Sequence, residues 1–317
     1  MNSLELHYHL DDNSHSMNAV VKNKAEAELL KLLFEVAHIL DLELDIEFEA
    51  LKQGGIKDVI KFFKKKKTKK KFEKLLIYFG GIVSGVIINV VADNLNKDKE
   101  LEELNKVEKK LNIQKLKNDL EKDSLTKQQE TVIIDKIVVN INQTHKVQVF
   151  KSRFYKTILK ESKVYQISSV ELDDNYNPTS IEKTIERGKF EKQILETEDL
   201  KPVTIEDANI EIVSPVLSHG NMKWKGIYNA KVFSFDLVDS DFKNSVLNRQ
   251  YSFSNGTSIK CRLEITSTLD ENGEELIKEA KVFEVQEVSD GKETHITKKG
   301  RHLREIKNQI KIDFKKE

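Results

Sequence analysis

Cysteine, proline and the common catalytic motifs are scarce or absent in this chain of 317 residues. A single cysteine, Cys261, excludes an intramolecular disulfide framework and a cysteine-based zinc site, and it is typical of a reducing compartment. Cys261 lies in the segment SIKCRLEI with no local base, so we expect a structural thiol. The sequence has no Walker loop, GxGxxG, HExxH, GxSxG or paired CxxC. We therefore expect no enzyme activity, no cofactor and no metal.

Long uncharged runs are also scarce, because 33% of the residues are Asp, Glu, Lys or Arg. The exception is residues 75–92, LLIYFGGIVSGVIINVVA, which as a helix would reach about 27 Å, close to the roughly 30 Å hydrocarbon core of a bilayer. We predict one transmembrane helix there, preceded by a polybasic collar at residues 64–74. The lysines predicted to contact lipid headgroups are Lys64, Lys65, Lys66, Lys67, Lys69, Lys70 and Lys71.

The predicted span has one aliphatic face, which suits lipid, and one face of small and polar residues. The second face would line a pore or pack against another helix, and it consists of Gly81, Ser84, Gly85, Asn89 and Ala92. Gly81 and Gly85 form a GxxxG pair, which lets two helix backbones approach closely. A lone span with such a face implies homo-oligomers. The alternative is a helix buried at the centre of a soluble oligomer.

Charges are segregated along the chain, although the formal net charge is zero. Residues 1–50 carry eleven acidic and three basic side chains, whereas residues 51–74 carry two and eleven. No signal peptide is expected. The positive-inside rule places the N-terminal unit and the collar in the cytoplasm, at a cell inner membrane. One complete span would then put residues 93–317 outside, whereas a re-entrant segment would not, and the sequence leaves both topologies open.

The first 63 residues predict a β-α-β-α unit. A strand is expected at Leu4–His9 and a helix from about Ser16 to Leu40. Residues 42–48 alternate between apolar and acidic side chains, which indicates a second strand with one buried face. IKDVIKFF, after Gly54 and Gly55, predicts a short amphipathic helix at the membrane interface.

A helical connector is predicted for residues 93–129, which contain no glycine or proline and many Leu, Glu and Lys. Residues 130–200 predict an α/β region. Its first segments, VIIDKIVVNI and KVQVF, are rich in branched residues and are expected to be strands. A short helix at 154–159, a strand at 164–172 and a helix at 180–195 would follow.

Residues 201–297 predict a β-rich domain, a small antiparallel barrel or a sandwich, for which a five-stranded OB-type barrel is one solution. Strands are expected at 209–213, 223–237, 251–253, 258–269 and 275–288, with a hairpin turn at DENG and a short helix at DFKNSVL. Residues 298–317 form a basic tail suited to a polyanion. Together these segments predict an α+β membrane protein.

Aromatic and cationic residues alternate near HGNMKWKGIY in the predicted β-rich domain. Rings can stack on bases and cations can bind phosphates, so this pattern is typical of single-strand binding. The predicted ligand-binding residues are Lys223, Trp224, Lys225, Tyr228, Arg249, Lys260 and Arg262, with Tyr251 beside them. The alternative for Trp224 is a place in the domain core.

Histidines and aspartates near the start of the chain could also ligate a metal ion. His7 and His9 share one face of the predicted first strand, with Asp11, Asp12 and His15 nearby. The favoured interpretation is that these are ordinary polar residues on the exposed face of an N-terminal edge strand and in the turn that follows it.

This arrangement of an N-terminal α/β unit, a small-residue membrane segment around Gly80–Asn89, a helical connector and a β-rich domain resembles bacterial anti-phage membrane effectors. More specifically, the layout looks like the channel subunit of Hailong-type defence, in which a DNA oligomer made by a partner nucleotidyltransferase controls a membrane pore. The resemblance implies a homo-oligomeric channel or membrane-disrupting effector, gated by a nucleotide or nucleic acid on the C-terminal domain. The alternatives are a non-conducting membrane-tethered adaptor and a soluble oligomer with residues 75–92 buried.

Overall fold

The computed structural model describes residues 2–12, 16–49, 56–64, 106–120, 122, 125–291 and 293–313. The chain divides into two compact units, residues 1–197 and 198–317. The predicted span at 75–92, its small-residue face and the collar from Lys65 onward lie outside the described residues. No helix among the residues that the structure describes is long and apolar enough to cross a membrane.

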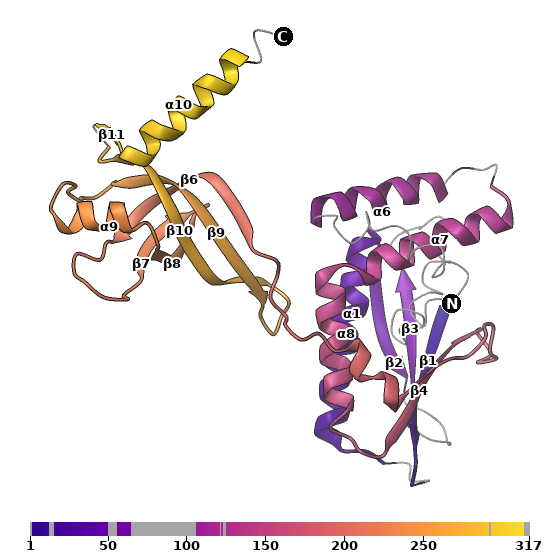
Figure 1. Ribbon diagram of the computed structural model, residues 1–317. Coiled ribbons are helices and arrows are strands. Elements are labelled where there is room, and N and C mark those ends of the chain that lie inside the picture. Colours follow the sequence, from indigo (N-terminus) through magenta and orange to yellow (C-terminus); the bar gives the residue numbers. More distant parts are fainter. Residues whose placement is uncertain are drawn as a thin grey trace. The chain divides into compact units, whose positions relative to one another are not determined.

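One antiparallel sheet forms the framework of the first unit (Figure 1). Its five strands have the order β2-β3-β1-β4-β5. They are β1 (Asn2–Leu10), β2 (Leu44–Glu49), β3 (Ile56–Lys64), β4 (Val164–Leu172) and β5 (Lys183–Glu186). Because β1 pairs with both β3 and β4, residues 1–63 and 130–200 share one sheet instead of forming the separate units predicted.

The central strand β1 confirms the strand predicted at Leu4–His9. Leu4, Leu6 and Tyr8 are buried in the hydrophobic core. His7 and His9 are only partly buried, because successive side chains of a strand point to opposite faces of the sheet.

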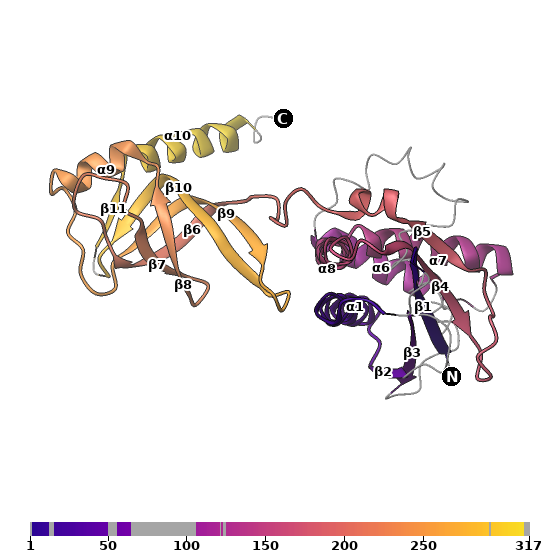
Figure 2. The ribbon, with the colours of Figure 1, turned by 90° about the horizontal axis from the view of Figure 1, so that it is seen from below.

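In the described part of this unit four helices accompany the sheet: α1 (Ala19–Ile39), α6 (Lys106–Leu120), α7 (Lys127–Asn142) and α8 (His145–Ile158). Helices α1 and α8 lie side by side in Figures 1 and 2 and contribute Leu29, Leu33 and Phe154 to the core shared with β1. The predicted connector is not one helix. Thr126 caps α7 in a capping box with Gln129, so α6 and α7 are separate helices that pack against each other.

Four predicted elements of this unit are wrong in type. IKDVIKFF forms β3 rather than a helix, because hydrogen bonding to β1 and β2 outweighs its helical spacing. VIIDKIVVNI and KVQVF lie in α7 and α8, where Ile134, Ile137 and Ile141 are buried at helical spacing. The segment predicted as a helix at 180–195 contains β5 and two 3₁₀ turns, Arg187–Lys189 and Glu191–Gln193.

The second unit is a closed five-stranded barrel, which decides between the predicted barrel and sandwich. Its strands are β6 (Val203–Ser214), β7 (Trp224–Tyr228), β8 (Lys231–Leu237), β9 (Ser258–Leu269) and β10 (Glu275–Ser289). The order β10-β8-β7-β6-β9 closes through the β9–β10 pair. The β8–β10 pair is parallel, so the barrel is not wholly antiparallel as predicted. Strand β11 (Thr294–Ile296) adds to β10.

One turn of the barrel was predicted and one was missed. Gly273 has a φ of +83°, which suits the predicted DENG hairpin between β9 and β10. The single strand predicted for residues 223–237 is a hairpin, because Asn229 and Ala230 both adopt positive φ and turn β7 into β8. No strand forms at residues 251–253.

Two helices complete the second unit. Helix α9 (Ser240–Leu247) lies between β8 and β9 in sequence and confirms the predicted short helix. The basic tail forms α10 (Lys298–Asp313), which follows β11 and projects from the barrel in Figure 1.

Candidate nucleic-acid interface

Trp224 was predicted to stack on a base, but it belongs to the barrel core. Its side chain is 1% exposed, and its ring lies 5.4 Å from Phe253 and 6.4 Å from Phe242 between centroids. Trp224 pairs across the hairpin with Phe235, and both face inward. The stacking role is therefore wrong, because a buried indole has no face for a ligand, and the alternative of a place in the domain core is confirmed.

Three predicted ligand-binding cations, on or next to the barrel strands, already have acidic partners. Lys223 lies 3.2 Å from Asp236. Lys260 pairs with Asp207 at 3.3 Å, and Arg262 pairs with Glu206 at 3.5 Å. Each pair reduces the positive charge that the strand face offers to a phosphate.

Two further predicted residues lie on the β7–β8 hairpin. Lys225 is exposed and pairs in the ladder with Ser234, on the outer face of β7. Tyr228 is half-buried against the core at the end of β7. The structure therefore spreads the predicted residues over the barrel and does not gather them in one site.

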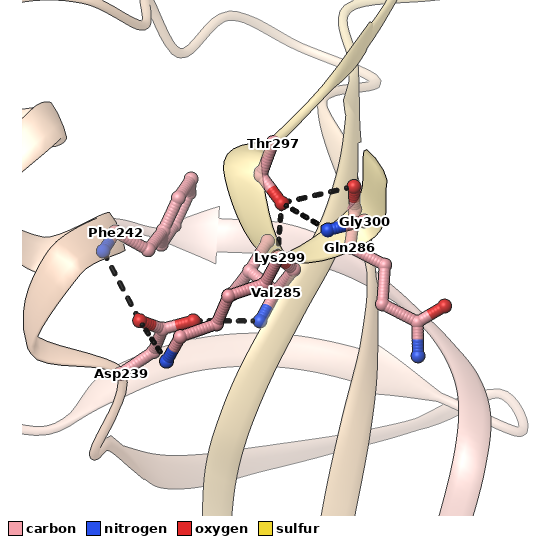
Figure 3. A network of polar contacts seen from close by, with 7 residues as sticks. All are labelled: Asp239, Phe242, Val285, Gln286, Thr297, Lys299 and Gly300. Atoms are coloured by element: carbon pink, nitrogen blue, oxygen red, sulfur yellow. Dashed lines mark hydrogen bonds and ion pairs between the residues drawn. The ribbon is translucent and has the colours of Figure 1, made fainter. Parts of the chain in front are cut away.

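A buried carboxylate joins α9, β10 and α10 at one corner of the barrel (Figure 3). Asp239 is 2% exposed and caps α9 by accepting a hydrogen bond from the Phe242 amide at 3.1 Å. It also accepts one from the Val285 amide at 2.9 Å. Its third partner is the Lys299 ammonium, at 2.8 Å. Asp239 thus fixes the first turn of α10 to the barrel.

Thr297 and Gly300 make a second attachment of α10 (Figure 3). The Thr297 hydroxyl donates to the Val285 carbonyl at 2.6 Å and accepts from the Gly300 amide at 3.0 Å. A Cβ on Gly300 would lie 2.1 Å from the Gln286 carbonyl oxygen, so only glycine fits this close approach. The start of α10 is therefore held in one position on β10.

Tyr251 lies at the surface end of the aromatic cluster beside this corner. Its ring centroid is 5.2 Å from that of Phe242, and its side chain is half-buried. Burial raises the pKa of Tyr251, and the nearby Arg301 guanidinium opposes that rise. Arg249 is exposed two residues before Tyr251, with a φ of +56°. Tyr251 therefore lies near the Arg301 cation of α10, and Arg249 precedes it by two residues in the same loop.

The basic charge of the second unit is concentrated on α10. Residues 203–296 contain ten Lys and Arg against sixteen Asp and Glu, whereas residues 298–313 contain six against two. A polyanion would thus be repelled by much of the barrel and attracted to α10. The sequence indicated these cations, but not that the helix bearing them is attached next to Tyr251.

The histidines of β1 do not form a metal site with the nearby aspartates. The His7 and His9 rings are 3.8 Å apart between centroids, and the His9 Nε2 lies 2.8 Å from the Ser168 hydroxyl. Asp12 pairs with Lys163 at 2.7 Å, and His15 lies outside the described residues. The described ranges contain no cluster of three potential metal ligands. Burial, aided by His9 and Lys57, lowers the pKa of His7 to about 4, so the imidazole is neutral at pH 7.

Cys261 is buried in the barrel on β9. Burial raises the pKa of its thiol to about 12, so the thiolate is scarce at neutral pH. The expected structural thiol is consistent with this position.

No protein-family model, curated protein or solved structure gives a significant match to the chain.

Proposed function

We propose that this chain is a homo-oligomeric membrane channel or membrane-disrupting effector of bacterial anti-phage defence. A nucleotide or nucleic-acid ligand on the C-terminal barrel would control it, and a partner nucleotidyltransferase would supply that ligand. The membrane segment would be residues 75–92, with the lysine collar among anionic lipid headgroups.

The observation that carries the ligand-binding part of the proposal is the strand order of the barrel. If β6 to β10 are numbered 1 to 5, neighbouring strands around the barrel have the order 1-2-3-5-4, and strand 4 pairs with strand 1 to close it. Strands 3 and 5 are parallel. Helix α9 follows strand 3 in the sequence. This is the arrangement of the OB fold, whose members bind oligonucleotides on one side of the barrel. Fold likeness alone does not specify a ligand, so the proposal depends on a binding test.

Pairing within the first sheet constrains the membrane topology. β3 ends at Lys64, and α6 begins at Lys106; both elements contribute to the core that contains β1 and β4. If residues 75–92 enter a membrane, β3 and α6 on either side of them would therefore lie on the same side of it. Eighteen residues cannot cross twice as helix, because one crossing takes about 20. We infer that this segment enters and leaves through one face, in place of the single complete span predicted.

This topology places the barrel on the cytoplasmic side together with the N-terminal sheet, because the sequence after residue 92 has no second uncharged run of comparable length. A cytosolic ligand would then reach its site. Gating would follow from a population shift: a ligand that binds the closed state more tightly than the open one keeps the pore shut, and its loss opens the pore.

Cysteine labelling tests the topology. In a Cys261→Ser background, Ala27→Cys on α1 and Ser234→Cys on β8 place one exposed thiol in each unit. We expect a membrane-impermeant maleimide to label both thiols in inverted vesicles and neither in intact spheroplasts. Labelling of the two positions from opposite sides would contradict the shared side.

Ion flux from liposomes tests the channel. Asn89→Leu should reduce flux several-fold without changing membrane extraction, because it replaces a polar group of the proposed pore face with an aliphatic one. Val90→Leu, on the proposed lipid face, is the matched control and should conduct as the unmodified chain does. A membrane-bound chain without flux would instead support the tethered adaptor, and a chain recovered without detergent would support the soluble oligomer.

A further inference from the structure

The strongest unassigned feature of the second unit is the surface beside Tyr251, whose pKa is affected by the Arg301 guanidinium of α10. Arg249 precedes Tyr251 by two residues, and Lys298 is the first residue of α10. These four residues are called the corner below. Lys298 and Arg301 are three residues apart on α10, so they lie on one side of that helix. The described residues provide no carboxylate partner for Arg249, Lys298 or Arg301, in contrast to Lys223, Lys260 and Arg262.

The corner is also held in place before any ligand arrives. The Lys299–Asp239 ion pair and the Thr297 hydrogen bonds fix the first turn of α10 on β10. Phe242 packs against Tyr251 at 5.2 Å, and its own amide is bound by Asp239. The backbone of the first turn of α10 and the Tyr251 ring are therefore positioned before binding, which reduces the conformational freedom that these elements lose when a partner binds.

We propose that this corner is the contact site for single-stranded nucleic acid, with Tyr251 stacking on a base and Arg249, Lys298 and Arg301 binding its phosphates. Rings beside unpaired cations are the combination that single strands require. The assignment deepens the proposed function and rests on it. It moves the site from Trp224 and the paired cations of the strands to the junction of the Tyr251 loop with α10.

The charges around the corner favour a polyanion that follows α10. Glu305 lies one turn beyond Arg301, and Arg304 is paired with Glu287 at 2.8 Å, so among the described side chains of α10 the cations without a carboxylate partner are at the start of the helix. Asp239 contributes no net negative charge there, because Lys299 neutralises it.

The test is binding of a fluorescently labelled DNA single strand of about 10 nucleotides to the full chain in detergent, a length within the range that one OB barrel covers. The corner variant is R249Q/K298Q/R301Q. The matched control, K223Q/K260Q/R262Q, removes the same number of charges from positions that have acidic partners. Emission of Trp224, the one tryptophan of the chain, shows whether the barrel of each variant is folded.

We expect the corner variant to bind the DNA about tenfold more weakly or worse. The slope of the logarithm of the binding constant against the logarithm of the salt concentration should become shallower by about two, since each single-strand phosphate contact contributes about 0.7 to that slope. The control should change less than about threefold, because its charges are already neutralised by partners. Tyr251→Leu should weaken binding by about fivefold or more, whereas Tyr251→Phe, which keeps the ring, should not.

Equal losses in both triple variants would overturn the site, because they would show a response to net charge alone. Equal competition by polyglutamate and by unlabelled DNA would overturn the nucleic-acid assignment. Normal binding by the folded corner variant would overturn the site but leave the proposed function standing. No binding by the unmodified chain would instead remove the ligand class itself.

Discussion

Replacing Arg187 by alanine is expected to lower the free energy of unfolding of the first unit by about 2–4 kcal/mol, because hydrogen bonds from charged groups contribute about 1.5–3 kcal/mol each and do not add fully. The guanidinium donates to the carbonyls of Leu159, Glu161 and Val164, each at 2.8 Å. These carbonyls cover the end of α8 and the start of β4. Hydrogen exchange of peptides spanning residues 145–172 measures the loss directly.

Two variants serve as controls for Arg187→Ala. Lys189→Ala removes an exposed cation from the same 3₁₀ turn and should change stability by less than about 0.5 kcal/mol. Arg187→Lys should give an intermediate loss, because one ammonium does not reproduce the planar fork of donors. Unchanged exchange in Arg187→Ala would show that water replaces the guanidinium at these carbonyls.

Replacing Asp239 by asparagine is expected to destabilise the barrel by about 2–4 kcal/mol, since breaking a buried charge pair leaves its partner uncompensated. The carboxylate accepts from the Val285 amide on one oxygen and from Lys299 and Phe242 on the other. An asparagine NH₂ would face a donor whichever way it turned. Denaturant titration followed by Trp224 emission reports on the barrel selectively, because Trp224 is buried in that unit.

The matched control for Asp239→Asn is Asp241→Asn, an exposed carboxylate in the first turn of α9. It should cost less than about 1 kcal/mol, the range of a charge near a helix N-terminus. Lys299→Met should cost less than Asp239→Asn, because both backbone amides keep their acceptor. If Asp239→Asn matched Asp241→Asn, the ion pair with Lys299 would contribute little to holding α10.

Sequence patterns located the barrel better than the first unit. In the barrel, β9 and β10 alternate between buried and partly exposed residues and are joined by a glycine turn, so local signals agree with the final pairing. In the first unit, β3 receives its hydrogen bonds from β1 and β2, and its own residues have helical spacing. A strand that depends on distant partners is poorly marked in its local sequence.

The candidate site was predicted in composition but not in position. Arg249 and Tyr251 were named from the sequence, and the cations of residues 298–316 were recognised as suited to a polyanion. The position of α10 beside the Tyr251 loop depends on the buried contacts of Asp239 with Lys299 and Val285. No local sequence pattern indicates that a carboxylate will be buried and will connect three elements. Trp224 was misplaced because alternation of cations and aromatics also describes a strand with one buried face.

The central position of β1 also has a consequence for biosynthesis. β4 ends about 160 residues after β1, and ribosomes add roughly 5–20 residues per second. The synthesis of β4, the second neighbour of β1, is therefore complete about 8–30 s after that of β1. During that interval one edge of β1 lacks its final partner, and the lysine-rich segment and residues 75–92 have already been synthesised. Nascent chains stalled before residue 164 should therefore depend on chaperones more than chains stalled after residue 186, where β5 has completed the sheet.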